Sequence, residues 1–122
     1  MSLCVLVLGT ENTAMGYGAL GATTSGHSNT AVGEAALDAN TTGIDNTALG
    51  SNTLGSNTTG NYNVAVGRKA IETNTTGSYN VAVGYFALKR SQNAKKSAYV
   101  LVLVWYGMVW LGQVVTVVQY KM

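Results

Sequence analysis

The most regular feature of the chain is a pattern of small, aliphatic and polar positions that recurs at every seventeenth position. Copies align without gaps over residues 12–28, 29–45, 46–62, 63–79 and 80–96. Such self-similarity indicates a repeat protein, in which successive copies stack on one another. The first, third and ninth places are filled, respectively, by Asn12, Asn29, Asn46, Asn63 and Asn80; by Ala14, Ala31, Ala48, Ala65 and Ala82; and by Leu20, Leu37, Leu54, Ile71 and Leu88.

Each copy predicts two short extended segments and two turns. The first segment is Asn-Thr/Val-Ala-aliphatic-Gly, and the second is centred on an Ala-Leu pair such as Ala36-Leu37. The stretch Asn40–Gly43, Asn-Thr-Thr-Gly, has the composition of a turn, as do its equivalents at Asn57 and Asn74. A 17-residue unit is too short for a propeller blade or a helical hairpin. We therefore expect an all-β fold, a β-solenoid or β-roll of about five coils.

The alternation of side chains along the first segment predicts which residues lie inside a coil. We expect the aliphatic fourth-place residues, Met15, Val32, Leu49, Val66 and Val83, to form one internal column, with the ninth-place residues as another. The alanines then lie on the opposite face. Their constant small size indicates close approach to another surface, either the other wall of the coil or, as the preferred interpretation, a neighbouring subunit. The repeated Asn side chains predict an amide ladder along one edge.

Both ends of the chain depart from the repeat. Residues 1–11 are expected to form an N-terminal capping strand, although Gly9–Glu11 still fits the end of a preceding copy. In residues 97–122 the stretch 98–120 is uncharged and mostly apolar. The favoured interpretation is a pair or trio of strands, roughly Tyr99–Tyr106 and Val114–Tyr120, that cap or oligomerise the solenoid. A membrane span and a C-terminus from an altered reading frame are the alternatives, and the β-branched run disfavours the span.

The composition supports a β-rich fold and says little about partners. The chain has 15 Gly, no Pro and only 10% charged residues, which disfavours both helices and charged disorder. Residues 1–61 contain four acidic residues and no Lys or Arg, whereas residues 62–122 contain all seven basic residues. An elongated molecule with this layout has an acidic end and a basic end. Cys4 is the only cysteine, so no disulfide can form within the chain.

The repeat unit Asn-Thr-Ala-Val-Gly-x-x-Ala-Leu-x-x-Asn-Thr-Thr-Gly resembles repeats of bacteriophage tail fibres, particularly those of marine phages. More distantly, it resembles the head repeats of trimeric autotransporter adhesins. The resemblance covers residues 9–90 and is closest over Asn29–Gly84. It implies a homotrimer, a location on a virion or cell surface, and a role in attachment to a host receptor or glycan. The resemblance lies in scaffold positions, so it carries over no receptor-binding residue.

The sequence does not predict an enzyme, a cofactor or a metal site. Gly16–Gly21 matches the Gly-x-Gly-x-x-Gly dinucleotide motif, but a turn-rich repeat follows it where that motif needs a helix. His27 is the only histidine, with Ser25 and Ser28 nearby and Asp45 about one coil away, and no nucleophile motif accompanies them. The basic group Lys89–Lys96 lacks the interleaved aromatic residues typical of a nucleic-acid site.

Two sets of repeated side chains are candidate surface contacts. Tyr62 and Tyr79 occupy equivalent places and are expected to stack, either as packing residues or as a small ridge for carbohydrate. Thr41, Thr58 and Thr75, each followed by a second Thr, predict a two-column threonine array. A trimeric fibre or adhesin module is therefore the leading hypothesis. The alternatives are an ice-binding solenoid that uses the threonine array and a surface protein anchored in a membrane by residues 98–120.

Overall fold

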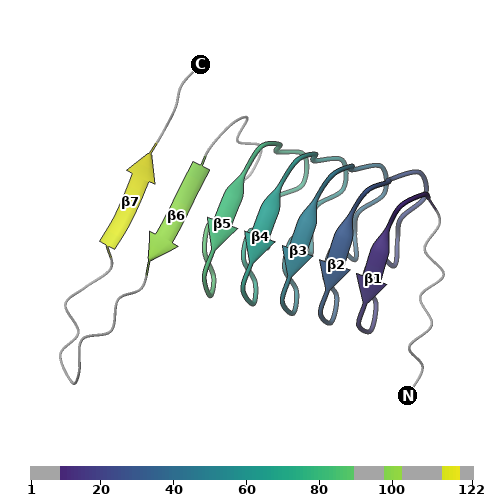
Figure 1. Cartoon of the computed structure of the whole chain (residues 1–122), viewed down its shortest axis with the longest axis horizontal. Helices are drawn as coiled ribbons and strands as arrows, with labels where there is room; N and C mark the ends of the chain where they lie inside the picture. Colours follow the sequence, from purple (N-terminus) through teal and green to yellow (C-terminus); the bar gives the residue numbers. More distant parts are fainter. Residues whose placement is uncertain (1–8, 90–97, 103–113, 119–122) are drawn as a thin grey trace.

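The computed structural model describes residues 9–89, 98–102 and 114–118, and over residues 9–89 the chain winds as a β-solenoid with one turn for each copy of the repeat. One three-residue strand lies in each turn (Figure 1). These strands are β1 (Thr13–Met15), β2 (Thr30–Val32), β3 (Thr47–Leu49), β4 (Val64–Val66) and β5 (Val81–Val83). The all-β solenoid predicted from the repeat is confirmed. Four turns are complete, and the fifth copy is described as far as Lys89.

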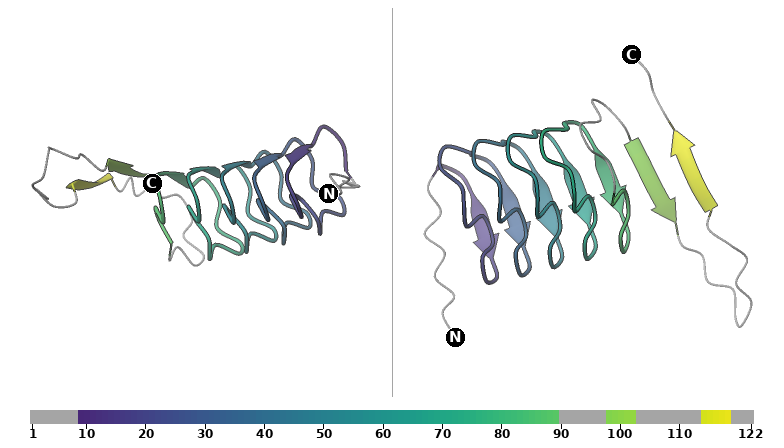
Figure 2. Two further views of the ribbon diagram at one scale, coloured as in Figure 1. Left: turned by 90° about the horizontal axis from the view of Figure 1, so that it is seen from below. Right: turned by 180° about the vertical axis from the view of Figure 1, so that it is seen from behind.

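Equivalent residues of successive copies stack directly on one another. The strands pair in parallel, and each residue is opposite its equivalent in the next copy, as in Thr30 with Thr47 and Ala31 with Ala48. The strands form one wall of the solenoid, and the rest of each turn closes the coil behind them (Figure 2). Backbone bonds also join the second segments, for example from Leu37 N–H to the carbonyl oxygen of Thr53 at 3.0 Å. Neighbouring turns are therefore held about 4.8 Å apart around the coil.

Two longer strands extend the same sheet beyond the solenoid (Figure 1). Strand β6 (Ala98–Val102) pairs in parallel with β5 through Val81 and Ala98, and β7 (Val114–Val118) runs antiparallel to β6. Both strands lie in the C-terminal segment predicted to form strands. Of the capping strand predicted for residues 1–11, residues 1–8 lie outside the described residues, and residues 9–11 form a bend and not a strand.

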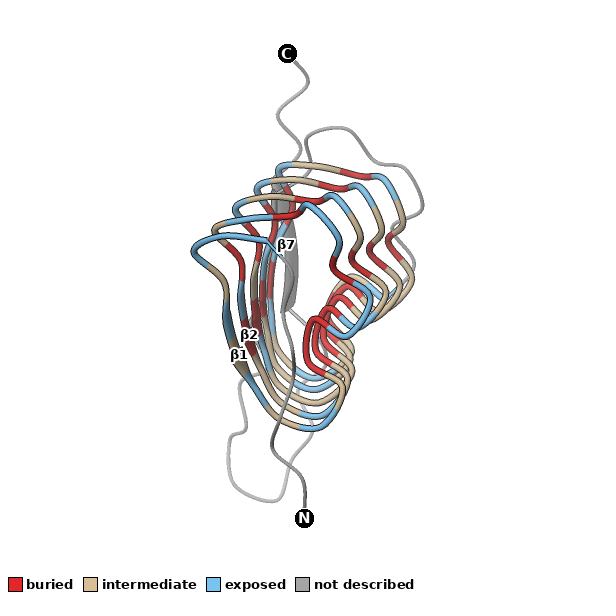
Figure 3. Ribbon diagram, turned by 90° about the vertical axis from the view of Figure 1, so that its right-hand side faces the viewer, coloured by how far each residue is buried: buried red, intermediate tan, exposed pale blue. Residues whose placement is uncertain are grey.

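The interior of the coil is lined by alanines and by the ninth-place aliphatic residues (Figure 3). Ala31, Ala48, Ala65 and Ala82 are fully buried, and they form one cluster with the Ala-Leu pairs of the opposite wall. The preferred interpretation of the alanines as a subunit contact is therefore wrong. They approach the other wall of their own coil, which was the alternative. A 17-residue turn is so narrow that only a methyl group fits between the strand and the second segment.

The prediction that the fourth-place aliphatic residues lie inside is also wrong. Their side chains point away from the coil. Met15, Leu49 and Val83 are exposed by 58%, 46% and 44%, while Val32 and Val66 are half-buried. Once the narrow interior selects alanine, the alternation along a strand places both neighbours of that alanine outside. The residues still stack as a column, but on the outer face of the sheet.

The first-place asparagines form a continuous amide ladder inside the solenoid instead of along an edge. Asn29, Asn46, Asn63 and Asn80 are fully buried. Each donates from Nδ2 to the side-chain oxygen of the previous asparagine, at 3.0–3.2 Å. A second buried ladder joins Asn40, Asn57 and Asn74 at 2.8–3.0 Å. These three also donate to a glycine carbonyl three residues later, as expected of turn residues. The ladders therefore provide hydrogen-bond partners for backbone groups that are buried in the turns.

Candidate binding surface

Three outward regions of the solenoid carry exposed side chains that could contact a partner. One is the outer face of the sheet, one is the edge that contains Tyr62 and Tyr79, and one is the corner that follows the strands. The second and fourth places of all copies carry no charge, so the outer face of β1–β5 presents Thr, Val, Leu and Met only. Val64 and Val81 are each exposed by 37% on this face. It is therefore an apolar strip along the solenoid.

The two tyrosines predicted to stack do so. The ring centroids of Tyr62 and Tyr79 lie 5.0 Å apart with an interplanar angle of 16°. The rings are exposed by 43% and 54%, respectively. Each ring covers one face of the other, which leaves mainly ring edges and the outer faces available to a ligand. The contact therefore serves packing between turns, and a carbohydrate role for the pair stays a prediction.

The threonine column is used partly to hold the turns together. The Thr41 hydroxyl donates to the carbonyl oxygen of Thr58 at 3.1 Å, and the Thr58 hydroxyl donates to that of Thr75 at 3.0 Å. Thr24 donates to the carbonyl oxygen of Thr41 in the same way. The hydroxyl protons of this column are thus directed along the solenoid axis, toward the next turn. The first column is therefore not an array of free hydroxyl donors, whereas Thr42 and Thr59 of the second column are exposed.

The His27 region lacks the arrangement of a catalytic triad. The Ser28 hydroxyl donates to Glu11 Oε2 at 3.0 Å, and His27 Nδ1 lies 3.2 Å from the Ser28 oxygen. The serine proton therefore points to a carboxylate, not to the imidazole that a triad uses as a base. Asp45 contacts His27 through the backbone, from its N–H to the His27 carbonyl oxygen.

The other candidate chemical sites can be placed in the same way. Gly16–Gly21 lies in the bend and second segment of the first turn, and in residues 9–89 no helix follows it. No group of three or more His, Cys, Asp or Glu side chains suited to a metal occurs among the described residues. Burial raises the pKa of the Asp38 carboxyl, while the backbone N–H groups of Ala39 and Asp38 act in the opposite direction.

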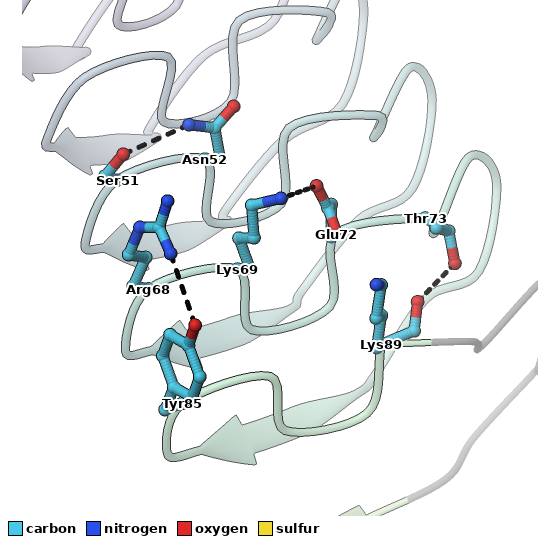
Figure 4. Close-up of polar contacts among 8 residues, drawn as sticks. All are labelled: Ser51, Asn52, Arg68, Lys69, Glu72, Thr73, Tyr85 and Lys89. Carbon is cyan, nitrogen blue, oxygen red and sulfur yellow. Dashed lines mark hydrogen bonds and ion pairs between the residues drawn. The ribbon is translucent and has the colours of Figure 1, made fainter.

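Sequence reasoning missed a cluster of cations and aromatic rings at the corner after β4 and β5. Arg68, Lys69, Tyr85, Phe86 and Lys89, here called the basic corner, come from the sixth, seventh and tenth places of adjacent copies. Figure 4 shows these side chains except that of Phe86. In the linear sequence, Lys89 begins a run of basic residues that extends to Lys96, which draws attention away from its place in the repeat. The aromatic partners precede it in its own copy, and two cations lie at the equivalent places of the preceding copy. Comparing the variable places column by column would have found them.

In the basic corner each cation lies against a ring. Arg68 Nη1 donates to the Tyr85 hydroxyl at 3.3 Å, and its Cζ is 6.0 Å from the centre of that ring. Lys69 Nζ and Lys89 Nζ lie 5.4 Å and 4.7 Å from the centre of the Phe86 ring. Phe86 is also in edge contact with Tyr85, with centroids 4.3 Å apart. The rings hold the cations close together on the surface.

Taken together, the fold places the chain in the class of β-solenoids with buried amide ladders. Comparisons with protein-family models, with curated proteins and with solved structures find no match for the chain. Over the part of the chain that the structure describes, no helix has the length and apolar character to span a bilayer.

Proposed function

We propose that the chain is a structural module of a phage tail fibre or a cell-surface attachment protein, and that it acts as a homotrimer. In this role the solenoid is a stiff spacer whose variable outward side chains are presented to a host receptor or glycan. Catalysis has no part in this proposal. The repeat resemblance motivates the attachment role. It is supported by the repeat itself, in which the constant places form the interior and the variable places face outward.

The uncharged outer face of β1–β5 is the observation that carries the proposal. Its exposed aliphatic residues form a strip that no described segment of the chain covers. A strip of this kind on a soluble solenoid favours burial against another surface. Since the same residue types repeat in every turn, copies of the chain that lie side by side would match along their whole length. This face replaces the alanine column as the expected subunit contact.

The oligomeric state tests the proposal directly. Light scattering coupled to size-exclusion chromatography should give the mass of three chains. Leu49 lies on the central strand and is 46% exposed, so Leu49→Lys should leave the single chain folded while it dissociates the trimer. Thr59→Lys, in an exposed turn away from the sheet, is the control and should remain trimeric. A wild-type monomer, or a trimer that tolerates Leu49→Lys, would count against the proposal.

The two other hypotheses receive less support. The ice-binding hypothesis needs threonine hydroxyls that face solvent, and the Thr41 and Thr58 hydroxyls donate to backbone carbonyls. The membrane-anchor hypothesis needs residues 98–120 as a span, and within this segment β6 and β7 are strands of the solenoid sheet.

A further inference from the structure

The repeat itself indicates where function-specific side chains lie. First-, third-, fifth- and ninth-place residues are nearly constant because they form the ladder, the core and the tight bend. The sixth and tenth places face outward and vary from copy to copy. The sixth place changes from Glu34 to Arg68, and the tenth changes from Asp38 to Lys89. Since the same backbone accepts opposite charges at these places, the fold does not dictate the choice of a cation there.

At the basic corner these variable places combine into one positively charged surface. Arg68, Lys69 and Lys89 are all the Lys and Arg residues in the described part of the chain, and they share this corner (Figure 4). Glu72 is the only acid among them and pairs with Lys69 at 3.1 Å. Three positive charges and one negative charge leave a net charge of +2. Arg68 and Lys89 have no ion-pair partner among the described residues.

The rings in the corner give it an apolar component beside the charge. Tyr85 is 55% exposed, and its ring makes a T-shaped contact with Phe86. An aromatic face carries partial negative charge and attracts the slightly positive C–H groups of a sugar ring. A guanidinium group binds a carboxylate or a sulfate through two parallel hydrogen bonds. A ligand that satisfies both features has anionic groups attached to saturated rings.

We propose that the basic corner binds an acidic polysaccharide, with Arg68 and Lys89 contacting its carboxylate or sulfate groups and Tyr85 contacting a sugar ring. This inference rests on the proposed attachment function and names the ligand class of that surface. Among the described residues, two unpaired cations offer few contacts to a nucleic-acid backbone, which carries one negative charge per about 1.7 Å of duplex. A polysaccharide with one charge per sugar fits the small number of cations better.

Binding of defined polymers to the full chain tests the proposal. Polygalacturonate, an uncharged dextran and a single-stranded oligodeoxynucleotide would be compared by biolayer interferometry at low and moderate salt. We expect binding to polygalacturonate that weakens with salt, and no binding to dextran. Arg68→Gln should reduce the affinity about tenfold, because it removes a charge-assisted contact. Tyr85→Ala should also weaken binding, and this effect should persist at moderate salt.

The control separates a local site from a general charge effect. Thr59→Glu lowers the net charge by one, as Arg68→Gln does, but at an exposed turn outside the basic corner, and it should leave the affinity within about twofold. Equal losses in Arg68→Gln and Thr59→Glu would overturn the proposal, as would equal affinity for the oligonucleotide or no binding to polygalacturonate. Arg68 is exposed, so its substitution should change neither the unfolding temperature of the chain nor the number of chains in the oligomer. An intact trimer without polygalacturonate binding overturns this inference alone, whereas a monomer overturns the attachment module.

Discussion

The side-chain oxygen of Asn46 accepts two hydrogen bonds from Asn63, one from its backbone N–H and one from its Nδ2, each at 3.0 Å. Asn46 in turn donates from Nδ2 to Asn29 and to the carbonyl oxygen of Gly60. One buried carboxamide therefore connects three successive turns. The ladder accounts for the constant asparagine, because no other side chain of this size offers an acceptor and two donors in these directions.

Asn46→Leu should destabilise the solenoid strongly. The substitution leaves the buried Asn63 N–H without its acceptor, which costs about 1–3 kcal/mol. It also removes the hydrogen bonds from Asn46 Nδ2 to Asn29 and to the Gly60 carbonyl, which keeps only the bond from Asn57. We expect a loss of at least about 3 kcal/mol in the free energy of unfolding, measured by urea denaturation with far-UV circular dichroism. Thr59→Ala, in an exposed turn, should stay within about 0.5 kcal/mol. Similar values for the two variants would contradict a structural role for the ladder.

Gly50→Ala should be poorly tolerated, although the added group is only a methyl. Gly50 has φ of 132°, and a Cβ there would lie 2.8 Å from the Gly67 carbonyl carbon and 2.9 Å from Thr53 Oγ1. We expect the free energy of unfolding to fall by about 2 kcal/mol or more, measured by thermal unfolding. Gly18→Asn is the matched control. Its φ is 72°, a Cβ meets nothing closer than 3.9 Å, and Asn52 occupies the equivalent place with φ of 56°. A neutral Gly50→Ala would show that the bend can relax.

A pair of substitutions on adjacent residues of β3 tests which face is inside. Ala48 is fully buried and Leu49 is 46% exposed. Ala48→Leu should overfill the coil and lower the free energy of unfolding by about 1–3 kcal/mol or more. Leu49→Ala should change the free energy of unfolding of the single chain only slightly and should mainly weaken association between chains. Unfolding measured at low protein concentration separates the two effects. The opposite ranking would place the leucine inside and the alanine outside.

The repeat sequence predicted the stacking but not which face of each strand lies inside. The spacing of Asn29, Asn46 and Asn63 alone fixes a parallel register of one copy per turn, so the solenoid followed from the sequence. The inside could not be chosen by hydrophobicity, because the segment Thr-Ala-Val is apolar on both faces. The better indicator of the interior face was the constant small size of the third-place residue, which is Ala48 in this copy. At the third place of each copy the interior accommodates only a methyl group, whereas the fourth place on the outer face accommodates Met15 and Val32 equally.

The candidate site was harder to predict because its residues belong to different copies. Arg68 and Tyr85 occupy the same place in successive copies and meet only when turns stack at the corner. Read linearly, Lys89 belongs to a basic run that extends to Lys96. The structure instead places Lys89 beside Phe86, which precedes it in the same copy. The Tyr62–Tyr79 contact was predictable because both members occupy the same repeat place and have the same identity.

Ile71 occupies a backbone conformation that suits its side chain poorly. Its φ is 52°, like the 52–54° of Leu20, Leu37, Leu54 and Leu88 at the same repeat place. A residue branched at Cβ is crowded in this left-handed region, whereas leucine branches one carbon farther from the backbone. Ile71→Leu should therefore raise the free energy of unfolding by about 0.5–1 kcal/mol, despite an unchanged side-chain volume.

The reverse substitution at the previous turn gives this prediction its control. Leu54 and Ile71 are both fully buried, and their N–H groups donate to equivalent carbonyls at 3.0 Å and 2.9 Å. Leu54→Ile should therefore destabilise by a similar amount, measured by urea denaturation under the same conditions. If both substitutions destabilise, the shape of the local core governs this place. Opposite signs would instead identify backbone strain as the reason that four of the five copies carry leucine here.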